Sequence, residues 1–153
     1  MKFKIPKPLT LEHEELHAEL VKAIKEKGKI GEVAKAVAEK LHPHFVKEEE
    51  YALPPLGLLF TLMKGEIRPE MKKVLKMTDK LKSDLPQMLR EHKTIVAELK
   101  KLISEAKKEK KTEFVHFAEK LMLHAKTEEE VMYPASLLIG EYLKLIFVRE
   151  VKK

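Results

Sequence analysis

Cysteine and tryptophan are absent from this chain of 153 residues, and it has only 5 glycines. Without cysteine it can form no disulfide, no thiolate metal site and no cysteine nucleophile. The scarcity of strand-favouring residues and turn clusters argues against a sheet protein. No apolar signal-peptide core follows Met1, and the longest apolar stretch, residues 52–63, contains prolines and is too short to span a bilayer. We therefore expect a cytoplasmic protein with no membrane partner.

Charged residues make up 37% of the chain and hydrophobic residues 44%, a mixture rich in Lys, Glu, Leu, Ala and Val that favours helices. The length suits one domain, residues 1–153, with room for a four-helix bundle. The net charge of +6 owes most to residues 100–111, where Glu alternates with Lys and no aromatic residue is present. Such a segment is more typical of a solvated helix end than of a phosphate-binding surface, so we expect no nucleic-acid partner.

Prolines and glycines divide the chain into four helical blocks. We predict an all-α, up-down four-helix bundle with helices at residues 10–27, 32–52, 70–108 and 112–132. Pro43 should bend the second helix and Pro86 should kink or split the third. Pro134 should end the fourth, leaving a short amphipathic helix at residues 135–148 that packs on the outside or against a partner.

An internal repeat relates the two halves of the chain. The pattern E-H-x-x-[LI]-x-A-E-L begins at Glu12 and again at Glu91, and H-x-x-x-E-E-E begins at His44 and again at His124. The offsets are 79 and 80 residues, and a proline follows each second motif. The repeats span about residues 12–56 and 91–136 within a core of about 9–137. Two related helix pairs predict pseudo-twofold symmetry, with any ligand near the axis.

Each predicted helix has an apolar stripe at helical spacing, and each stripe contains a histidine. Two stripes add a glutamate one turn after the histidine, where both side chains can reach one ion. A lone histidine on such a stripe is more often a hydrogen-bonded core residue, but two matching sets favour metal, since buried ionisable groups need compensation. The candidate ligands are His13, His44, Glu48, His92, His124 and Glu128.

This ligand set predicts two ions, each bound by two histidines and bridged by both glutamates. Nitrogen and carboxylate donors without sulfur suit iron or manganese and would also accept zinc. Glu49, Glu50, Glu129 and Glu130 lie off the stripes and should face solvent, and His42 and His116 should be peripheral.

These motifs resemble the hemerythrin-like, or HHE cation-binding, domains. The resemblance rests on L-x-x-E-H-x-x-L at residues 9–16, H-P-H-F-x-x-E-E-E at 42–50, R-E-H at 90–92, and H-x-x-x-E-E-E with a later Y-P at 124–134. It covers nearly the whole chain and involves all four helices. It implies a carboxylate-bridged di-iron centre, in a family of oxygen carriers and sensors, iron-centre repair and nitric oxide response proteins, and iron-sensing domains.

The resemblance leaves the role of His17 open. Oxygen carriers of the family usually have five histidine ligands, including H-x-x-x-H on the third helix, where this chain has Val96 as the second residue. Here the H-x-x-x-H pair is on the first helix, at His13 and His17. His17 is therefore either a fifth histidine ligand or a group that only supports the ligands.

The function expected from these features is a non-haem di-iron protein that binds dioxygen or nitric oxide, rather than a classical enzyme. It would serve in oxygen or nitric oxide sensing, iron-centre repair or a redox stress response. The alternative is an iron-sensing module whose metal binding orders the bundle for a partner. A structural bundle without metal is a third interpretation. The apolar residues 53–63 and 137–147 also leave open a homodimer.

Overall fold

The computed structural model describes residues 3–151 and the side chains up to Arg149. Across this part of the chain the secondary structure is helical and no strand is present. The expected all-α bundle is therefore confirmed. Its main helices are α1 (Lys7–Ile24), α2 (Lys29–Lys47), α4 (Lys72–Lys108), α5 (Thr112–Thr127) and α6 (Tyr133–Val151). Shorter elements join them: the π-helices η1 (Glu48–Ala52) and η4 (Glu128–Met132), the 3₁₀-helices η2 (Pro54–Leu58) and η3 (Pro69–Met71), and α3 (Leu59–Met63).

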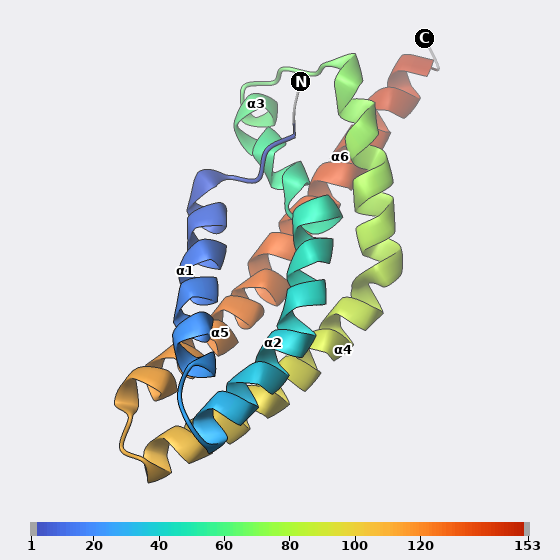
Figure 1. Cartoon of the computed structure of the whole chain (residues 1–153). Coiled ribbons are helices and arrows are strands. Elements are labelled where there is room, and N and C mark those ends of the chain that lie inside the picture. The colour runs from blue at the N-terminus through green and yellow to red at the C-terminus, as the bar shows by residue number, and fades with distance from the viewer. Residues whose placement is uncertain (1–2, 152–153) are drawn as a thin grey trace.

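The four bundle helices alternate in direction. Helices α1 and α4 run towards one end of the bundle and α2 and α5 run back from it, so that the α1–α2 and α4–α5 turns lie at the same end (Figure 1). Gly28, which precedes α2, has a φ of +77°, a conformation that favours glycine in this tight turn. Between the two helix pairs, η2, α3 and η3 carry the chain across the opposite end (Figure 1).

Pro134 does not end the fourth helix, contrary to the sequence prediction. Helices α5 and α6 form one continuous rod through η4, visible as the uninterrupted orange-to-red ribbon in Figure 1. In the π-turn the Tyr133 N–H donates to the Glu128 carbonyl, one residue further back than in an α-helix. Pro134 follows at the start of α6, where a missing N–H is tolerated. The C-terminal segment is thus helical as expected, but it is part of the fourth helix.

Pro86 does not split α4. The helix is continuous over 37 residues, and its ribbon changes direction about midway (Figure 1). The part before Pro86 packs against α6, where Lys144 Nζ lies 2.6 Å from Asp79 Oδ1. Gly140 of α6 makes this approach close: a Cβ atom there would lie within 3.0 Å of three atoms of Thr78.

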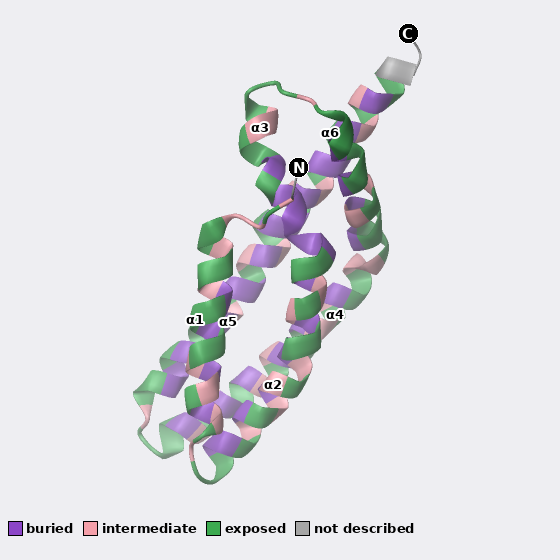
Figure 2. Cartoon of the chain, turned by 45° about the horizontal axis from the view of Figure 1, so that its top comes forward, coloured by how far each residue is buried: buried purple, intermediate pink, exposed green. Residues whose placement is uncertain are grey.

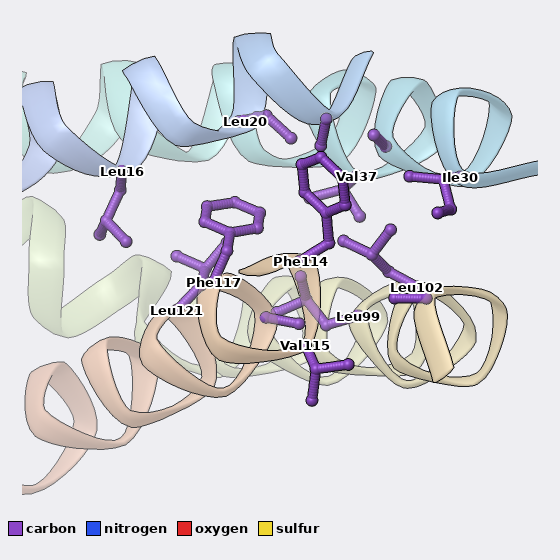
Figure 3. Packing of buried hydrophobic residues seen from close by; sticks show 14 of the residues in the cluster. Leu16, Leu20, Ile30, Val37, Leu99, Leu102, Phe114, Val115, Phe117 and Leu121 are labelled. Carbon is purple, nitrogen blue, oxygen red and sulfur yellow. The ribbon is translucent and has the colours of Figure 1, made fainter. Parts of the chain in front are cut away.

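Buried residues line the inner faces of the helices (Figure 2), and the hydrophobic ones among them form two apolar regions, the second of which consists of two clusters. The larger one lies towards the α1–α2 and α4–α5 turns, where Leu16, Val37, Leu99 and Phe117 interdigitate (Figure 3). The other lies towards α3 and α6 and includes Tyr51, Leu53, Met71, Met88 and Tyr133. The histidines and glutamates singled out by the sequence lie between these regions, so apolar side chains pack above and below them.

By length and composition alone, the helix Thr112–Arg149 is apolar enough to cross a membrane. Core helices pass the same test, and this one places His124 and Glu128 in the protein interior. We therefore interpret it as a core helix, and the expected lack of a membrane partner stays a prediction.

The close packing of α4 on α6 can be tested at Gly140. Gly140→Val should lower the free energy of unfolding by about 1–3 kcal/mol, because the added methyl groups overlap Thr78 and force the helices apart. Denaturant unfolding of the metal-free protein measures this. Leu138→Val, at an exposed position of the same helix, is the matched control and should change little. Equal stability of the two variants would contradict the close helix contact.

Candidate metal centre

Six side chains from four helical segments meet in the middle of the bundle. They are His13, His44, Glu48, His92, His124 and Glu128, and none is more than 5% exposed. They form two groups whose donor atoms lie within 4.8 Å of one another. The first group is His13, His124, Glu48 and Glu128; the second is His44, His92, Glu48 and Glu128. We call them the first and second half-sites. Both glutamates belong to both.

The half-sites combine residues from the two sequence repeats. The first pairs His13 of repeat one with His124 of repeat two, and the second pairs His44 with His92. The 79- and 80-residue offsets exchange these pairs, as expected for a pseudo-twofold axis between them. Neither repeat could therefore build a half-site alone.

The two bridging carboxylates begin the two π-helices. Glu48 is the first residue of η1 and Glu128 is the first residue of η4. The Glu48 carbonyl accepts the Leu53 N–H at 2.9 Å, and the Glu128 carbonyl accepts the Tyr133 N–H. Single π-turns are rare and occur often at functional sites, where the wider turn redirects side chains. Here the wider turn follows each carboxylate directly, at corresponding positions of the repeats.

Each histidine directs Nε2 inwards and Nδ1 towards a carboxylate outside the cluster. His44 Nδ1 lies 2.8 Å from Glu91 Oε1, and His92 Nδ1 lies 3.1 Å from Glu129 Oε1. His13 Nδ1 lies 3.5 Å from Glu49 Oε1, and His124 Nδ1 is hydrogen-bonded to Glu12 Oε1. A carboxylate at Nδ1 holds the proton there and leaves Nε2 free to bind a metal, as in many histidine metal sites.

These outer carboxylates correct the sequence interpretation. Glu49 and Glu129 were expected to face solvent, yet both face histidines, although Glu49 stays 55% exposed. Glu12 and Glu91 directly precede His13 and His92, and Glu49 and Glu129 directly follow the bridging glutamates. The repeated E-H and E-E pairs were the available signal in the sequence. In each pair, helical geometry turns the glutamate next to the inward-facing residue towards the neighbouring helix.

Glu91 is the most firmly held of the outer carboxylates. Its Oε2 accepts Lys47 Nζ at 2.7 Å and Gln87 Nε2 at 3.2 Å. Burial alone would raise the pKa of Glu91, but the hydrogen bonds from Lys47, His44 and Gln87 lower it. Burial would lower the pKa of His44, but the neighbouring carboxylates Glu48 and Glu91 outweigh this effect and raise it. In His13 burial prevails and the pKa is lowered, which favours the neutral, metal-binding form.

The pKa values of the two shared carboxylates are shifted in opposite directions. Burial would raise the pKa of Glu48, but hydrogen bonds with Glu128, His44 and Tyr133 lower it to about 2. Burial and the nearby Glu48 charge raise the pKa of Glu128 well above its usual range. Two adjacent buried carboxylates cannot both ionise without a cation, so the pair retains a proton that a metal would replace.

The donor atoms fit a metal. His13 Nε2, Glu48 Oε1, His124 Nε2 and Glu128 Oε2 are buried with no hydrogen-bond partner in the described part of the chain. All four point into the first half-site. Four orphaned donor atoms would be costly in a core without compensation, and a cation supplies it.

His17 lies outside both half-sites. Its side chain is exposed and lines a surface pocket of about 440 Å³ with His13, Phe45 and His42. The apolar stripe predicted for the first helix included His17, but the structure places this residue at the surface. His42 and His116 are exposed, as expected, and Val96 is partly buried outside the cluster. Phe45 stacks on His13, with ring centroids 4.0 Å apart and planes within 4°.

Tyr133 is part of the centre and was not among the predicted site residues. Its hydroxyl donates to Glu48 Oε2 at 2.5 Å and lies 3.2 Å from Nε2 of both His44 and His92. Burial, then the charges of Glu48 and Glu128, raise the pKa of this phenol. The Y-P pair of the repeat was visible in the sequence, but tyrosine is common in cores and the expected helix end at Pro134 placed it outside the bundle.

Comparison with known proteins gives one family. The family model described as Hemerythrin HHE cation binding domain matches residues 7–136. No curated protein matches the chain significantly. No solved structure matches it significantly either. The matched residues include all six convergent side chains and Tyr133.

Loss of an outer carboxylate should lower the affinity of the centre for metal. Glu91→Gln should weaken metal binding by about 10- to 100-fold, because His44 loses the charged partner that orients it. Competition with a chromophoric chelator measures the affinity. Glu50→Gln, at an exposed position outside the centre, should bind metal like the unchanged protein. Equal affinities of the two variants would show that Glu91 does not support the site.

Proposed function

Because this chain belongs to the hemerythrin HHE cation-binding domains, we propose that its buried centre holds two iron ions and binds a small ligand such as dioxygen or nitric oxide. The observation that supports this most directly is the sharing of Glu48 and Glu128 by two donor groups. Two carboxylates that face two histidine pairs suit a pair of ions, each with two nitrogen and two oxygen donors.

The donor chemistry favours iron. Imidazole and carboxylate without sulfur suit iron or manganese, and zinc would be accepted. Four protein donors leave room for further ligands on an ion that prefers six, and bound iron would supply the redox chemistry and affinity for diatomic ligands that the side chains lack. We see no nucleophile or organic-substrate motif near the site, so binding rather than group transfer is the proposed activity.

The surrounding residues give access from one side. The pocket lined by Phe45, His17 and His42 reaches His13, a member of the first half-site. A small ligand could pass from this pocket beside the His13 ring. The second half-site instead lies beside the buried cluster that contains Tyr51, Met88 and Tyr133. Access through the pocket would therefore deliver the ligand to the first half-site.

Elemental analysis tests the metal assignment. Protein purified without chelators or a histidine tag should contain about two irons per chain, as two half-sites of this type would hold. Glu48→Ala and Glu128→Ala should each lose most of the iron, because each removes a donor from both half-sites. Glu130→Ala, at an exposed position of the same π-helix, is the control and should keep both. No iron in the unchanged protein, even after anaerobic ferrous loading, would refute the proposal.

A second candidate is an iron-sensing module. The outer face of α6 presents Leu138, Tyr142, Leu145 and Val148, each at least 42% exposed, and this apolar face would suit a protein partner or a second copy of the chain. In that case metal binding would order the bundle, and the partner would recognise the ordered form.

Thermal unfolding and oxygen reactivity separate the two functions. At a ferrous concentration 100-fold above Kd, each bound iron should stabilise the protein by about 2.7 kcal/mol, which a calorimetric scan detects as a higher Tm. The ligand-binding function also predicts a change in the iron absorption spectrum when oxygen or nitric oxide is added. A large rise in Tm without any spectral response would favour the sensing module.

A further inference from the structure

The two half-sites differ although the repeat makes their ligands equivalent. The four buried atoms without hydrogen-bond partners all belong to the first half-site, within the described part of the chain. Three of the corresponding atoms in the second half-site share one polar neighbour, the Tyr133 hydroxyl. His44 Nε2, His92 Nε2 and Glu48 Oε2 all lie within 3.2 Å of the Tyr133 hydroxyl.

The position of this hydroxyl matches that of a metal ligand. Bonds from first-row divalent metals to nitrogen or oxygen are roughly 2.1 Å long. Two donors at right angles on such an ion lie about 3.0 Å apart, and donors at a tetrahedral angle about 3.4 Å apart, by the same bond length. The hydroxyl lies 3.2 Å from each histidine Nε2, within this interval. The hydroxyl is therefore spaced from both histidines as a further ligand of the same ion would be, and its hydrogen bond holds it 2.5 Å from Glu48 Oε2.

The repeat supplies no such donor to the first half-site. The 80-residue offset that relates Glu128 to Glu48 relates Tyr133 to Leu53, and each precedes a proline. Both residues follow the π-turn of their repeat and both are buried, at 1% exposed each. Leu53 and Tyr133 thus hold corresponding positions after the two π-turns, but leucine has no donor atom.

We infer that Tyr133 is a fifth protein ligand of the metal in the second half-site, and that Leu53 leaves the corresponding position of the first half-site free for an external ligand. This inference rests on the proposed di-iron function. On metal binding, the phenol proton now donated to Glu48 is released to solvent, and Glu48 Oε2 and the phenolate oxygen both face the ion. The external ligand would then bind on the His13 side, which the surface pocket reaches.

The spectrum of the ferric protein tests the ligand role. A phenolate bound to ferric iron produces a charge-transfer band in visible light, and resonance Raman excitation in that band enhances tyrosinate ring modes. The iron-loaded protein should show both, and Tyr133→Phe should lose both. Tyr51→Phe is the matched control, because Tyr51 lies in the same apolar layer at 3% exposed but is hydrogen-bonded to Asp84, outside the centre. It should keep the band.

Azide binding tests the free position. At saturation of the ferric protein, Tyr133→Phe should bind one azide more per chain than the unchanged protein, because the loss of the phenol opens one position in the second half-site. A tyrosine that only supports the fold would leave the azide count unchanged when replaced by phenylalanine.

The results separate this inference from the di-iron proposal. Two irons per chain without tyrosinate modes in the unchanged protein would overturn the ligand role of Tyr133 and leave the di-iron proposal standing. This result needs no variant, so it decides the question even if Tyr133→Phe folds poorly. Loss of the band in both tyrosine variants, or equal numbers of azide per chain in the unchanged protein and Tyr133→Phe, would also overturn the inference. Failure to load iron at all would instead refute the di-iron proposal.

Discussion

The enclosure of ionisable side chains between two apolar layers is the constraint on which this structure depends. Six titratable residues lie in the bundle centre at no more than 5% exposure, with Leu and Phe side chains on one side and Met and Tyr side chains on the other. Burying a carboxylate or an imidazole without a partner costs free energy. This cost is large beside the total free energy of unfolding of a domain, which is about 5–15 kcal/mol. The bundle meets this constraint by outer carboxylates at each Nδ1 and by the Tyr133 hydrogen bond to Glu48, and its donor groups could hold a metal ion.

Internal duplication explains how one short chain supplies so many convergent groups. Each repeat contributes two histidines, one bridging glutamate and two outer glutamates at corresponding positions. Because each half-site takes one histidine from each repeat, the centre exists only when the two helix pairs associate. Differences after the π-turns break the symmetry: Leu53 and two prolines lead into η2 and α3, whereas Tyr133 and a single proline lead into α6. The pseudo-twofold axis therefore relates the histidines and glutamates of the two half-sites, and the residues that follow the two π-turns make the half-sites different.

The fold and the convergence of the six side chains could be predicted because both depend on local periodicity. Apolar spacing marks the helices, and the paired H-x-x-x-E motifs mark the inner face, irrespective of how the helices are joined. His17 was harder to place, because one helical turn beyond His13 the stripe borders the surface and periodicity alone cannot locate its edge. The outer carboxylates were missed for a related reason: Glu49 and Glu129 point away from their own helix's core face and towards a neighbouring helix, which is tertiary information.

Pro134 shows why a correct local rule can still mislead. Proline disfavours the interior of an α-helix because it lacks an N–H and clashes with the preceding turn. That argument assumes i→i+4 hydrogen bonding, and the π-turn that begins at Glu128 replaces it locally with a wider turn. The continuous helix then turns Tyr133 into the core, where the expected helix end would have left it outside. The π-turn that made the predicted helix end wrong is thus the same feature that brings the Tyr133 phenol to His44 and His92. The π-turn that begins at Glu128 thus explains two things: why the proline rule failed at Pro134, and why Tyr133, five residues after Glu128, makes the second half-site differ from the first.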